Sequence, residues 1–332
     1  MPDRPIDGER ILELGAGFMP ACIISAAAEL GIWSLLAADP LSAEQVASRI
    51  EADLRGATIL LDAVAALGLL EKRDGRYRTP PSLVSLLTAK GEQTILPMLW
   101  HRAALLRGWA QLSWTVRAGF PAPRSATLRG PEADRAAFIA AMHSVSAPIA
   151  DSLAARIVPP GFRHLLDVGG ASGTWTLAFL RAAPQATATI VDLPDAIEQA
   201  RQRVARSEWA ERITLVAGDF YVDPLPPGAD FAWLGAIAHQ HSRRHNQALL
   251  AKVHAALEPG GRVALRDVVM ESDRLRPLDG ALFAVNMLVN TTCGGTFTFE
   301  EFAEDLQAAG FERPTWRVKQ PGMNNVIEAF KP

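Results

Sequence analysis

The 332-residue chain has little cysteine and little excess charge. Its two cysteines, Cys22 and Cys293, are too few and too far apart for a disulfide framework or a zinc knuckle. A formal net charge of −3 gives no bulk attraction to nucleic acid or anionic lipid. Residues 1–10 lack the basic and then apolar layout of a signal peptide. We therefore expect a reduced, cytoplasmic protein without nucleic-acid or membrane partners.

The composition otherwise fits a soluble protein with a sizeable core, because 49% of residues are hydrophobic and 21% are charged. The apolar run at residues 18–33 is interrupted by Pro20 and Glu29 and is too weak for a predicted membrane span. Residues 11–36 predict one or two helices with a break at 17–20. Their apolar faces on both sides suit burial against another chain.

Residues 41–80 have the layout of a winged helix. Ser42 and Gln45 form a capping box that opens a short helix, and a second helix is predicted over 54–67, ended by Gly68. The turn Asp74-Gly75 predicts a β-hairpin. The second helix, with its N-cap, carries one arginine and two aspartates, whereas a DNA-reading helix needs several basic or amide side chains. We therefore expect a packing module.

The stretch at residues 162–192 predicts a βαβ unit with a glycine turn. An apolar strand reaches Asp167, the chain turns through Gly169, Gly170 and Gly173, and a helix follows over 174–182. A second strand over 187–191 ends on Asp192. The glycine spacing does not match the G-x-G-x-x-G pattern of nicotinamide-binding folds. A carboxylate at the tip of the second strand suits a ribose.

Three carboxylates follow successive predicted strands: Asp167, Asp192 and Asp219. Asp192 is placed to accept from the ribose hydroxyls, Asp219-Phe220 is placed beside an adenine, and Asp167 can meet an ammonium group. Each aspartate alone fits a helix cap. The three together predict S-adenosylmethionine.

The rest of the chain continues the alternation. Strands are predicted at 213–220, 229–239 and 262–270, with helices between them and at 280–289 and 298–309, and a hairpin closes the chain. The fourth strand is expected to deliver His239. This pattern predicts a doubly wound, mostly parallel sheet.

The segments DVGGASG, VDLP, GDFY and LEPGGRV resemble the caffeate- and acetylserotonin-type O-methyltransferases of plants and bacteria, over nearly the whole chain. The resemblance implies a Rossmann-like class I methyltransferase domain, with a mostly parallel seven-stranded sheet, behind an N-terminal winged-helix dimerisation domain. We expect dimerisation at 1–100, a helical linker lining the acceptor pocket at 101–155, and a catalytic domain at 156–332. The expected assembly is a homodimer.

The resemblance also implies residue roles. His239 matches the family's general base, although Gln240 and His241 replace its usual aspartate and tryptophan. Asp267 matches the first of the acids that orient this histidine, and no second acid aligns. The expected cofactor contacts are Asp167, Gly169, Gly170, Gly173, Asp192, Leu193, Gly218, Asp219 and Phe220. The expected contacts with a small aromatic hydroxylated acceptor are Phe138, Met142, His143, Met287 and Asn290. S-adenosylhomocysteine would be the product.

Three alternatives stay open at this point. The altered triplet 239–241 is compatible with an enzyme that keeps the cofactor but carries out hydroxylation, decarboxylation or cyclisation. A winged-helix regulator that senses S-adenosylmethionine is a second. The third is a zinc site, because His239, His241 and His245 have an H-x-H-x3-H spacing. We expect no metal, because no cysteine or carboxylate joins these histidines in the sequence.

Overall fold

The computed structural model describes residues 6–91 and 93–332. The chain divides into two compact units. Unit 1 comprises residues up to Arg107 together with Arg124–Ser144, and unit 2 comprises Gly108–Pro123 and Val145–Pro332. The first five residues of the expected dimerisation domain, and Glu92, lie outside the described residues.

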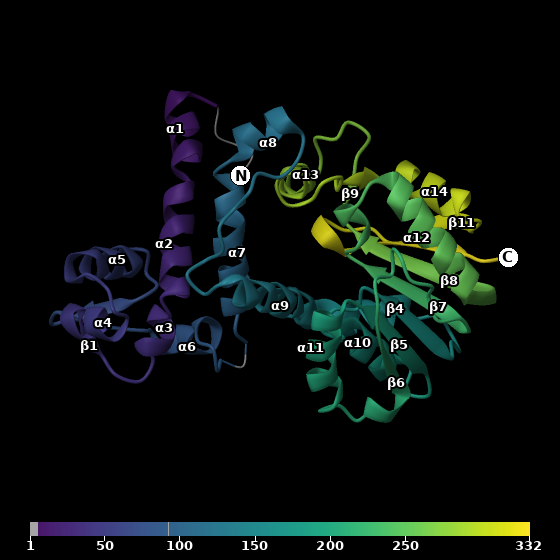
Figure 1. The fold of residues 1–332 in the computed structure, drawn as a ribbon, viewed down its shortest axis with the longest axis horizontal. Coiled ribbons are helices and arrows are strands. Elements are labelled where there is room, and N and C mark those ends of the chain that lie inside the picture. Colours follow the sequence, from purple (N-terminus) through teal and green to yellow (C-terminus); the bar gives the residue numbers. More distant parts are fainter. Residues whose placement is uncertain (1–5, 92) are drawn as a thin grey trace. The chain divides into compact units, whose positions relative to one another are not determined.

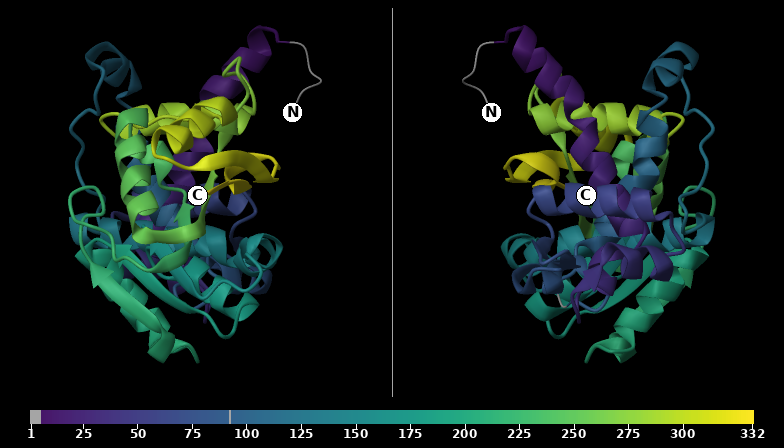
Figure 2. Two further views of the ribbon diagram at one scale, coloured as in Figure 1. Left: turned by 90° about the vertical axis from the view of Figure 1, so that its right-hand side faces the viewer. Right: turned by 90° about the vertical axis from the view of Figure 1, so that its left-hand side faces the viewer.

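Unit 1 begins with the apolar helices α1 (Gly8–Ala16), α2 (Phe18–Glu29) and α3 (Ile32–Leu35). The predicted break lies at Gly17, and Figures 1 and 2 show α1 continuing the line of α2. Large apolar side chains of these helices remain exposed in the single chain, such as Leu12 at 76% and Phe18 at 62%. By length and composition, residues 8–29 and 131–157 could each cross a membrane, a property that core helices of soluble proteins share.

The winged-helix prediction is confirmed. Helices α4 (Ala43–Arg49) and α5 (Leu54–Ala66) precede the hairpin of β2 (Glu71–Arg73) and β3 (Arg76–Arg78). The capping box of Ser42 and Gln45 is present, and Gly68 takes a positive φ of 75° after α5. A two-residue strand, β1 (Leu41–Ser42), adds to the hairpin. Ile32, Trp33, Leu61 and Tyr77 are buried in the core of this unit.

Further helices follow the hairpin. They are α6 (Pro81–Leu87), α7 (Leu96–Trp109), α8 (Leu112–Ala118) and α9 (Pro131–Ile157). The division between the units falls within α7 and α9.

Unit 2 is built on a seven-stranded sheet in the order β11-β12-β8-β7-β4-β5-β6. Strands β4 (His164–Val168), β5 (Thr187–Asp192), β6 (Ile213–Ala217), β7 (Ala229–Gly235) and β8 (Leu257–Asp267) are parallel. The terminal hairpin of β11 (Glu312–Val318) and β12 (Asn325–Phe330) is antiparallel. This matches the predicted doubly wound sheet with a hairpin at its edge.

The helices of this unit alternate with the strands. They are α10 (Thr174–Ala182), α11 (Pro194–Val204), α12 (Arg243–Ala256), α13 (Leu278–Asn290) and α14 (Phe299–Ala308). Short segments η1 (Ala210–Arg212), η2 (Ala238–Gln240), η3 (Gly322–Asn324), β9 (Val269–Met270) and β10 (Phe297–Thr298) complete it.

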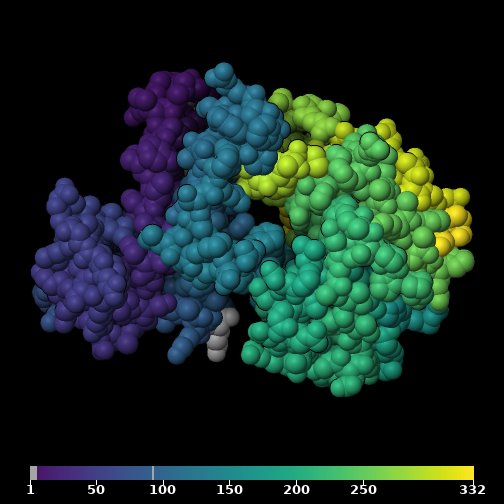
Figure 3. Space-filling model, viewed as in Figure 1, coloured from purple at the N-terminus to yellow at the C-terminus, as the bar shows by residue number. Residues whose placement is uncertain are grey.

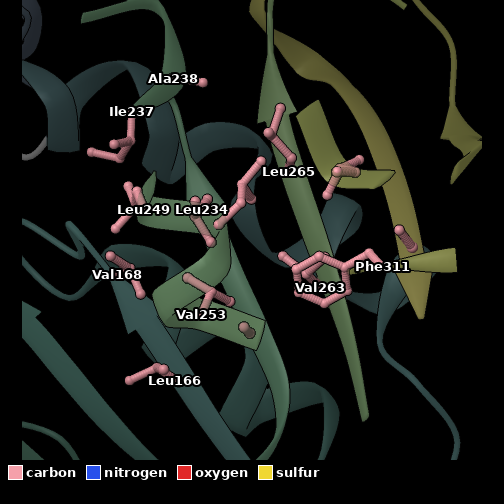
Figure 4. Packing of buried hydrophobic residues seen from close by; sticks show 14 of the residues in the cluster. Leu166, Val168, Leu234, Ile237, Ala238, Leu249, Val253, Val263, Leu265 and Phe311 are labelled. Atoms are coloured by element: carbon pink, nitrogen blue, oxygen red, sulfur yellow. The ribbon is translucent and has the colours of Figure 1, made fainter. Parts of the chain in front are cut away.

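Side chains alternate along each strand, so both faces of the sheet carry apolar side chains, and helices cover both faces. On one face, Phe231 and Trp233 pack with Phe179 of α10. On the other, Leu234 packs in a cluster with Leu249 and Val253 of α12 (Figure 4). Figure 3 shows the side chains on one face of the molecule, in the orientation and colours of Figure 1.

Candidate functional site

The candidate site lies where the strand order of the sheet reverses. From β4 the chain proceeds to β5 and β6 on one side, and it later returns to β7 and β8 on the other. The segments that follow these parallel strands meet at one edge of the sheet (Figure 1). Open α/β sheets bind ligands in the crevice at such a switch point.

The turn after β4 requires glycine for both conformation and space. Gly169 and Gly173 have positive φ angles of 70° and 75°. A Cβ atom on Gly170 would lie 2.7 Å from Ile190 Cγ2 and 2.9 Å from Asp167 Cγ. A Cβ on Gly169 would lie 2.3 Å from Ile237 Cδ1. The backbone of this turn is therefore pressed against β5 and the segment after β7, with no room for side chains.

Asp167 lies beneath this turn rather than at the tip of its strand. Its residue is 1% exposed, and it accepts a 2.5 Å hydrogen bond from Thr176 Oγ1. Burial raises the pKa of Asp167 to about 7, and the neighbouring charge of Asp192 adds to the rise. Among the described residues, no ion pair involves Asp167 or Asp192. A cationic ligand at this turn would supply the missing positive charge.

Asp192 stands at the end of β5, as predicted. Its carboxylate accepts from the backbone N–H groups of Ala171 and Leu193, both at 2.7 Å. Burial raises its pKa, although these two bonds oppose the rise. A carboxylate has about four lone-pair positions, so two bonds leave capacity for ligand hydroxyls. Leu193 is 51% exposed beside it.

The segment after β6 is held by a lysine from α12. Strand β6 ends at Ala217, earlier than predicted, so Gly218, Asp219 and Phe220 lie in the loop. Lys252 Nζ donates to the carbonyl oxygens of Phe220 (3.3 Å), Tyr221 (2.8 Å) and Asp223 (2.9 Å). The Asp219 carboxylate accepts from the Tyr221 N–H at 2.9 Å. Phe220 Cε1 lies 3.6 Å from where a Cβ of Gly169 would be, which brings this loop to the glycine turn.

The fourth strand does not carry His239, contrary to the sequence prediction. Strand β7 ends at Gly235, and His239 lies in the 3₁₀ turn η2. Ala236 has a φ of 65°, a conformation that is costly for a residue with a side chain and is concentrated at functional sites. Ile237 and Ala238 are buried in the core beside α12 (Figure 4). These two anchors and the turn at Ala236 fix His239 in space.

The structure pairs His239 with Asp267, the residue at the end of β8. His239 Nδ1 lies 2.9 Å and 3.0 Å from the two carboxylate oxygens of Asp267. The same carboxylate accepts from the backbone N–H of His239 (3.1 Å) and of Val268 (2.8 Å). A carboxylate only accepts, so Nδ1 carries a proton, and in the neutral imidazole the lone pair is therefore on Nε2. Phe283 of α13 packs edge-on against the ring at 4.8 Å.

The expected acceptor contacts are divided between the two units. Phe138, Met142 and His143 belong to unit 1, where Phe138 packs against His101 at 5.1 Å. Met287 and Asn290 belong to α13 in unit 2. Met287 is only 6% exposed, and the Asn290 amide donates to the Asn286 backbone carbonyl at 2.7 Å. Trp109 Nε1 donates to Asn286 Oδ1 at 3.1 Å, so Asn286 and Asn290 form a hydrogen-bonded pair of polar side chains on α13.

The three histidines of the H-x-H-x3-H spacing do not form one group. His239 is held by Asp267, whereas His241 and His245 gather with Cys293. The sequence did not indicate that Cys293, Thr176, Lys252 and Phe283 contact residues of the candidate site. No local signal marks them, because each meets its partner through the tertiary fold.

The chain matches two protein-family models and is similar to known enzymes over most of its length. The family model for the O-methyltransferase domain matches residues 102–312, and that for the O-methyltransferase dimerisation domain matches residues 12–87. The chain is 33% identical to the 3-hydroxy-5-methyl-1-naphthoate 3-O-methyltransferase of Streptomyces sahachiroi, over 97% of this chain and 94% of that protein. It is 31% identical to the acetylserotonin O-methyltransferase of Gallus gallus, over 91% of both chains.

Two solved structures share the fold over nearly their whole length. Human N-acetylserotonin methyltransferase, in complex with S-adenosylmethionine, has a TM-score of 0.83 and 28% identity, covering 100% of this chain and 99% of that one. PigF with S-adenosylhomocysteine has a TM-score of 0.88 and 26% identity, covering 98% of this chain and 100% of that one. The chain therefore belongs to the family of S-adenosylmethionine-dependent O-methyltransferases that carry this dimerisation domain.

Proposed function

We propose that this enzyme methylates a hydroxyl group on a small aromatic molecule, with His239 as the general base and Asp267 as the residue that orients it. The similar proteins act on a naphthoate and on acetylserotonin, according to their names, and both acceptors contain an aromatic ring system. The single observation that carries the mechanism is the contact of both Asp267 oxygens with His239 Nδ1.

The residues at the switch point fit the cofactor. A glycine turn without room for side chains allows close approach of a ligand to the backbone. Asp192 has free acceptor capacity for ribose hydroxyls. The unpaired acids Asp167 and Asp192 suit a ligand that carries positive charge. We propose that these residues bind S-adenosylmethionine together with Gly169, Gly170, Gly173, Leu193 and the loop residues Gly218, Asp219 and Phe220.

The chain's part in the reaction is to position the acceptor and remove a proton. S-adenosylmethionine supplies a methyl group on a positively charged sulfur, which passes to the acceptor oxygen and leaves S-adenosylhomocysteine. A phenol with a pKa of about 10 is mostly protonated at neutral pH, so its oxygen is a weak nucleophile. His239 Nε2 takes the hydroxyl proton as the oxygen attacks. Asp267 then stabilises the resulting imidazolium through its contact with Nδ1.

Removal of the base tests this mechanism. In His239→Ala we expect kcat to fall by about 10²–10⁴ with little change in cofactor affinity, because the base acts in the chemical step. The assay is transfer of a labelled methyl group to a panel of naphthols, catechols and hydroxyindoles. His164→Gln is the control, because His164 begins β4 at the opposite end of the strand. An unchanged kcat in His239→Ala would contradict the base assignment and leave proximity as the source of catalysis.

The acceptor contacts are proposed to come from Phe138, Met142, His143, Met287 and Asn290. Substitution of these residues should change KM among acceptors more than it changes cofactor affinity. Chemistry other than methyl transfer is not favoured, because the relatives quoted above are methyltransferases. A regulatory role is not favoured either, since α5 and its N-cap lack the basic residues of a DNA-reading helix.

We also propose that the enzyme is a homodimer, with residues 1–100 as the dimerisation domain, 101–155 as the acceptor-lining linker and 156–332 as the catalytic domain. The exposed apolar side chains of α1 and α2 are the support, since such patches mark association surfaces. Leu12→Glu should convert the dimer to a monomer in analytical ultracentrifugation. Glu13→Gln, which changes a polar neighbour on the same helix, should leave the dimer intact. A monomeric wild-type enzyme at micromolar concentration would contradict this proposal.

A further inference from the structure

A cluster of two histidines and one cysteine lies beside the candidate base. His241 follows η2, His245 is in the first turn of α12, and Cys293 is in the loop after α13. Their potential ligand atoms all lie within 4.8 Å of one another. His245 Nδ1 and Cys293 Sγ are already 3.8 Å apart. All three residues belong to unit 2.

We propose that His241, His245 and Cys293 bind one Zn²⁺ ion. Two imidazoles and a thiolate form a ligand set of borderline-soft character, which zinc prefers over the oxygen ligands of magnesium or calcium. With bonds of about 2.0 Å to nitrogen and 2.3 Å to sulfur, tetrahedral ligand atoms lie about 3.3–3.6 Å apart. The 3.8 Å separation is close to that distance, and the remaining separations, within 4.8 Å, need shifts of up to about 1.5 Å by side chains that are half-buried or exposed.

The surroundings suit the ligand forms that zinc requires. Burial lowers the pKa of His241, with the charge of His245 contributing, which favours the neutral imidazole that zinc binds. Ser242 Oγ lies 2.8 Å from His245 Nδ1 and also caps the His245 backbone N–H at 3.4 Å. Zinc at His245 Nδ1 would replace the contact of this nitrogen with Ser242 Oγ, while the hydrogen bond from the His245 backbone N–H to Ser242 Oγ would remain. Binding would also release the thiol proton of Cys293.

Access and a fourth position are both available. Ser242 and Cys293 line an open hollow of about 460 Å³, so solvent reaches the cluster on the side of Cys293. The Tyr221 ring packs on His241 with centroids 3.9 Å apart. Its hydroxyl is buried and has no hydrogen-bond partner among the residues that the structure describes. A zinc-bound water would give this hydroxyl a partner. The site is therefore of the type with three protein ligands and one exchangeable position.

Zinc here would connect two loops that support the base. The Gly295 N–H donates to the His239 carbonyl at 2.9 Å, and a Cβ on Gly294 would lie 2.5 Å from that same oxygen. Cys293 adjoins these glycines, and His241 is two residues beyond His239. A metal that joins Cys293 to His241 and His245 would therefore fasten residues 291–296 to residues 239–245.

Metal binding to the full-length, untagged protein tests the proposal without any turnover. The protein is stripped with a chelator, exposed to equimolar Zn²⁺, desalted and analysed for metal content. We expect one zinc per chain and a higher melting temperature. Titration with Co²⁺ should give the near-ultraviolet charge-transfer absorption of a cobalt–thiolate bond, with visible bands of a tetrahedral site.

Matched variants locate the site. Cys293→Ser should abolish the charge-transfer absorption and weaken zinc binding by at least about tenfold, since loss of even an outer partner of a ligand costs that much. His241→Ala and His245→Ala should weaken binding similarly. Cys22→Ser and His164→Gln should bind like the wild type, and circular dichroism checks that every variant is folded. Absence of stoichiometric zinc, equal binding by Cys293→Ser and Cys22→Ser, or loss of binding in His239→Ala would each overturn the proposal. None of these results would decide whether His239 is the base, because that proposal is tested separately by methyl transfer in His239→Ala.

Discussion

Asp167 and Asp267 are equally buried, at 1% exposure, but their carboxylates have different hydrogen-bond partners. Asp267 is met by the His239 ring and by two backbone N–H groups. Asp167 is met by the Thr176 hydroxyl, and burial raises its pKa to about 7. The protein therefore supplies Asp267 with several hydrogen-bond donors, whereas Asp167 has no positively charged partner among the described residues. The comparison indicates that the proposed catalytic pair is assembled within the protein itself, whereas a positively charged ligand would complete the proposed cofactor end.

The largest expected effect comes from Asp267→Asn, which keeps the shape and removes the charge. The backbone N–H groups of His239 and Val268 donate to different oxygens of Asp267, so the amide of the variant leaves one of them without an acceptor. The neutral amide also holds the Nδ1 proton more weakly and no longer stabilises the imidazolium, which weakens the base. We expect kcat to fall by about 10²–10⁴, measured by labelled methyl transfer. A fall of less than about threefold would show that Asp267 does not set the tautomer.

Gly170→Ala tests how closely the glycine turn is pressed against β5. The new Cβ would meet Ile190 and Asp167 within 3 Å, and both neighbours are buried. We expect a loss of about 1–3 kcal/mol in the free energy of unfolding, together with weaker cofactor binding. Gly295→Ala is the matched control, because its Cβ would meet nothing within 4 Å. Equal stability of the two variants in thermal denaturation would contradict the close packing.

Asp167→Asn tests the unpaired acid through pH. The folded pKa of about 7 exceeds the ordinary 3.8, so the folded state holds an extra proton between these values. The contribution of Asp167 to stability therefore falls as pH rises from about 4 to about 7. Without cofactor, Asp167→Asn should melt higher than the wild type at pH 8 and similarly at pH 4.

Cofactor binding gives the complementary result. A cation favours the ionised carboxylate, so wild-type affinity for S-adenosylmethionine should rise with pH through about 7 and binding should release a proton. Asp167→Asn should bind roughly tenfold more weakly at pH 8, equivalent to about 1.4 kcal/mol, and lose the pH dependence. Calorimetry in two buffers of different ionisation enthalpy measures both effects. A pH-independent wild type would show that the cofactor's charge does not act on Asp167.

The smallest effect is expected at Lys252, which holds the loop after β6. Lys252→Met removes three hydrogen bonds to carbonyl oxygens and should raise the cofactor KM roughly fivefold, equivalent to about 1 kcal/mol. Lys331→Met is the matched control, because Lys331 Nζ donates to the carbonyl oxygens of His254 and Leu257, away from the candidate site. Both variants should lose stability, but only Lys252→Met should change KM.

Much of the fold was predictable because its signals are local. The capping box at Ser42, the break at Gly17 and the helix over 174–182 each depend on residues within one or two turns. The order of strands and helices then restricts the sheet to a doubly wound topology. The error at His239 had a local cause. The apolar run continues past Gly235 into Ile237 and Ala238, which are buried without being part of a strand.

The sequence by itself determined the family, the glycine turn and the identity of His239 and Asp267 as candidates. Only the tertiary structure decided their contact, because 28 residues separate them and two neighbouring strands bring them together. It likewise placed Cys293 beside His241 and His245, although 48 residues separate it from the nearer histidine. Periodicity and capping act over a few residues, whereas a site that joins several strand ends depends on the packing of the whole sheet.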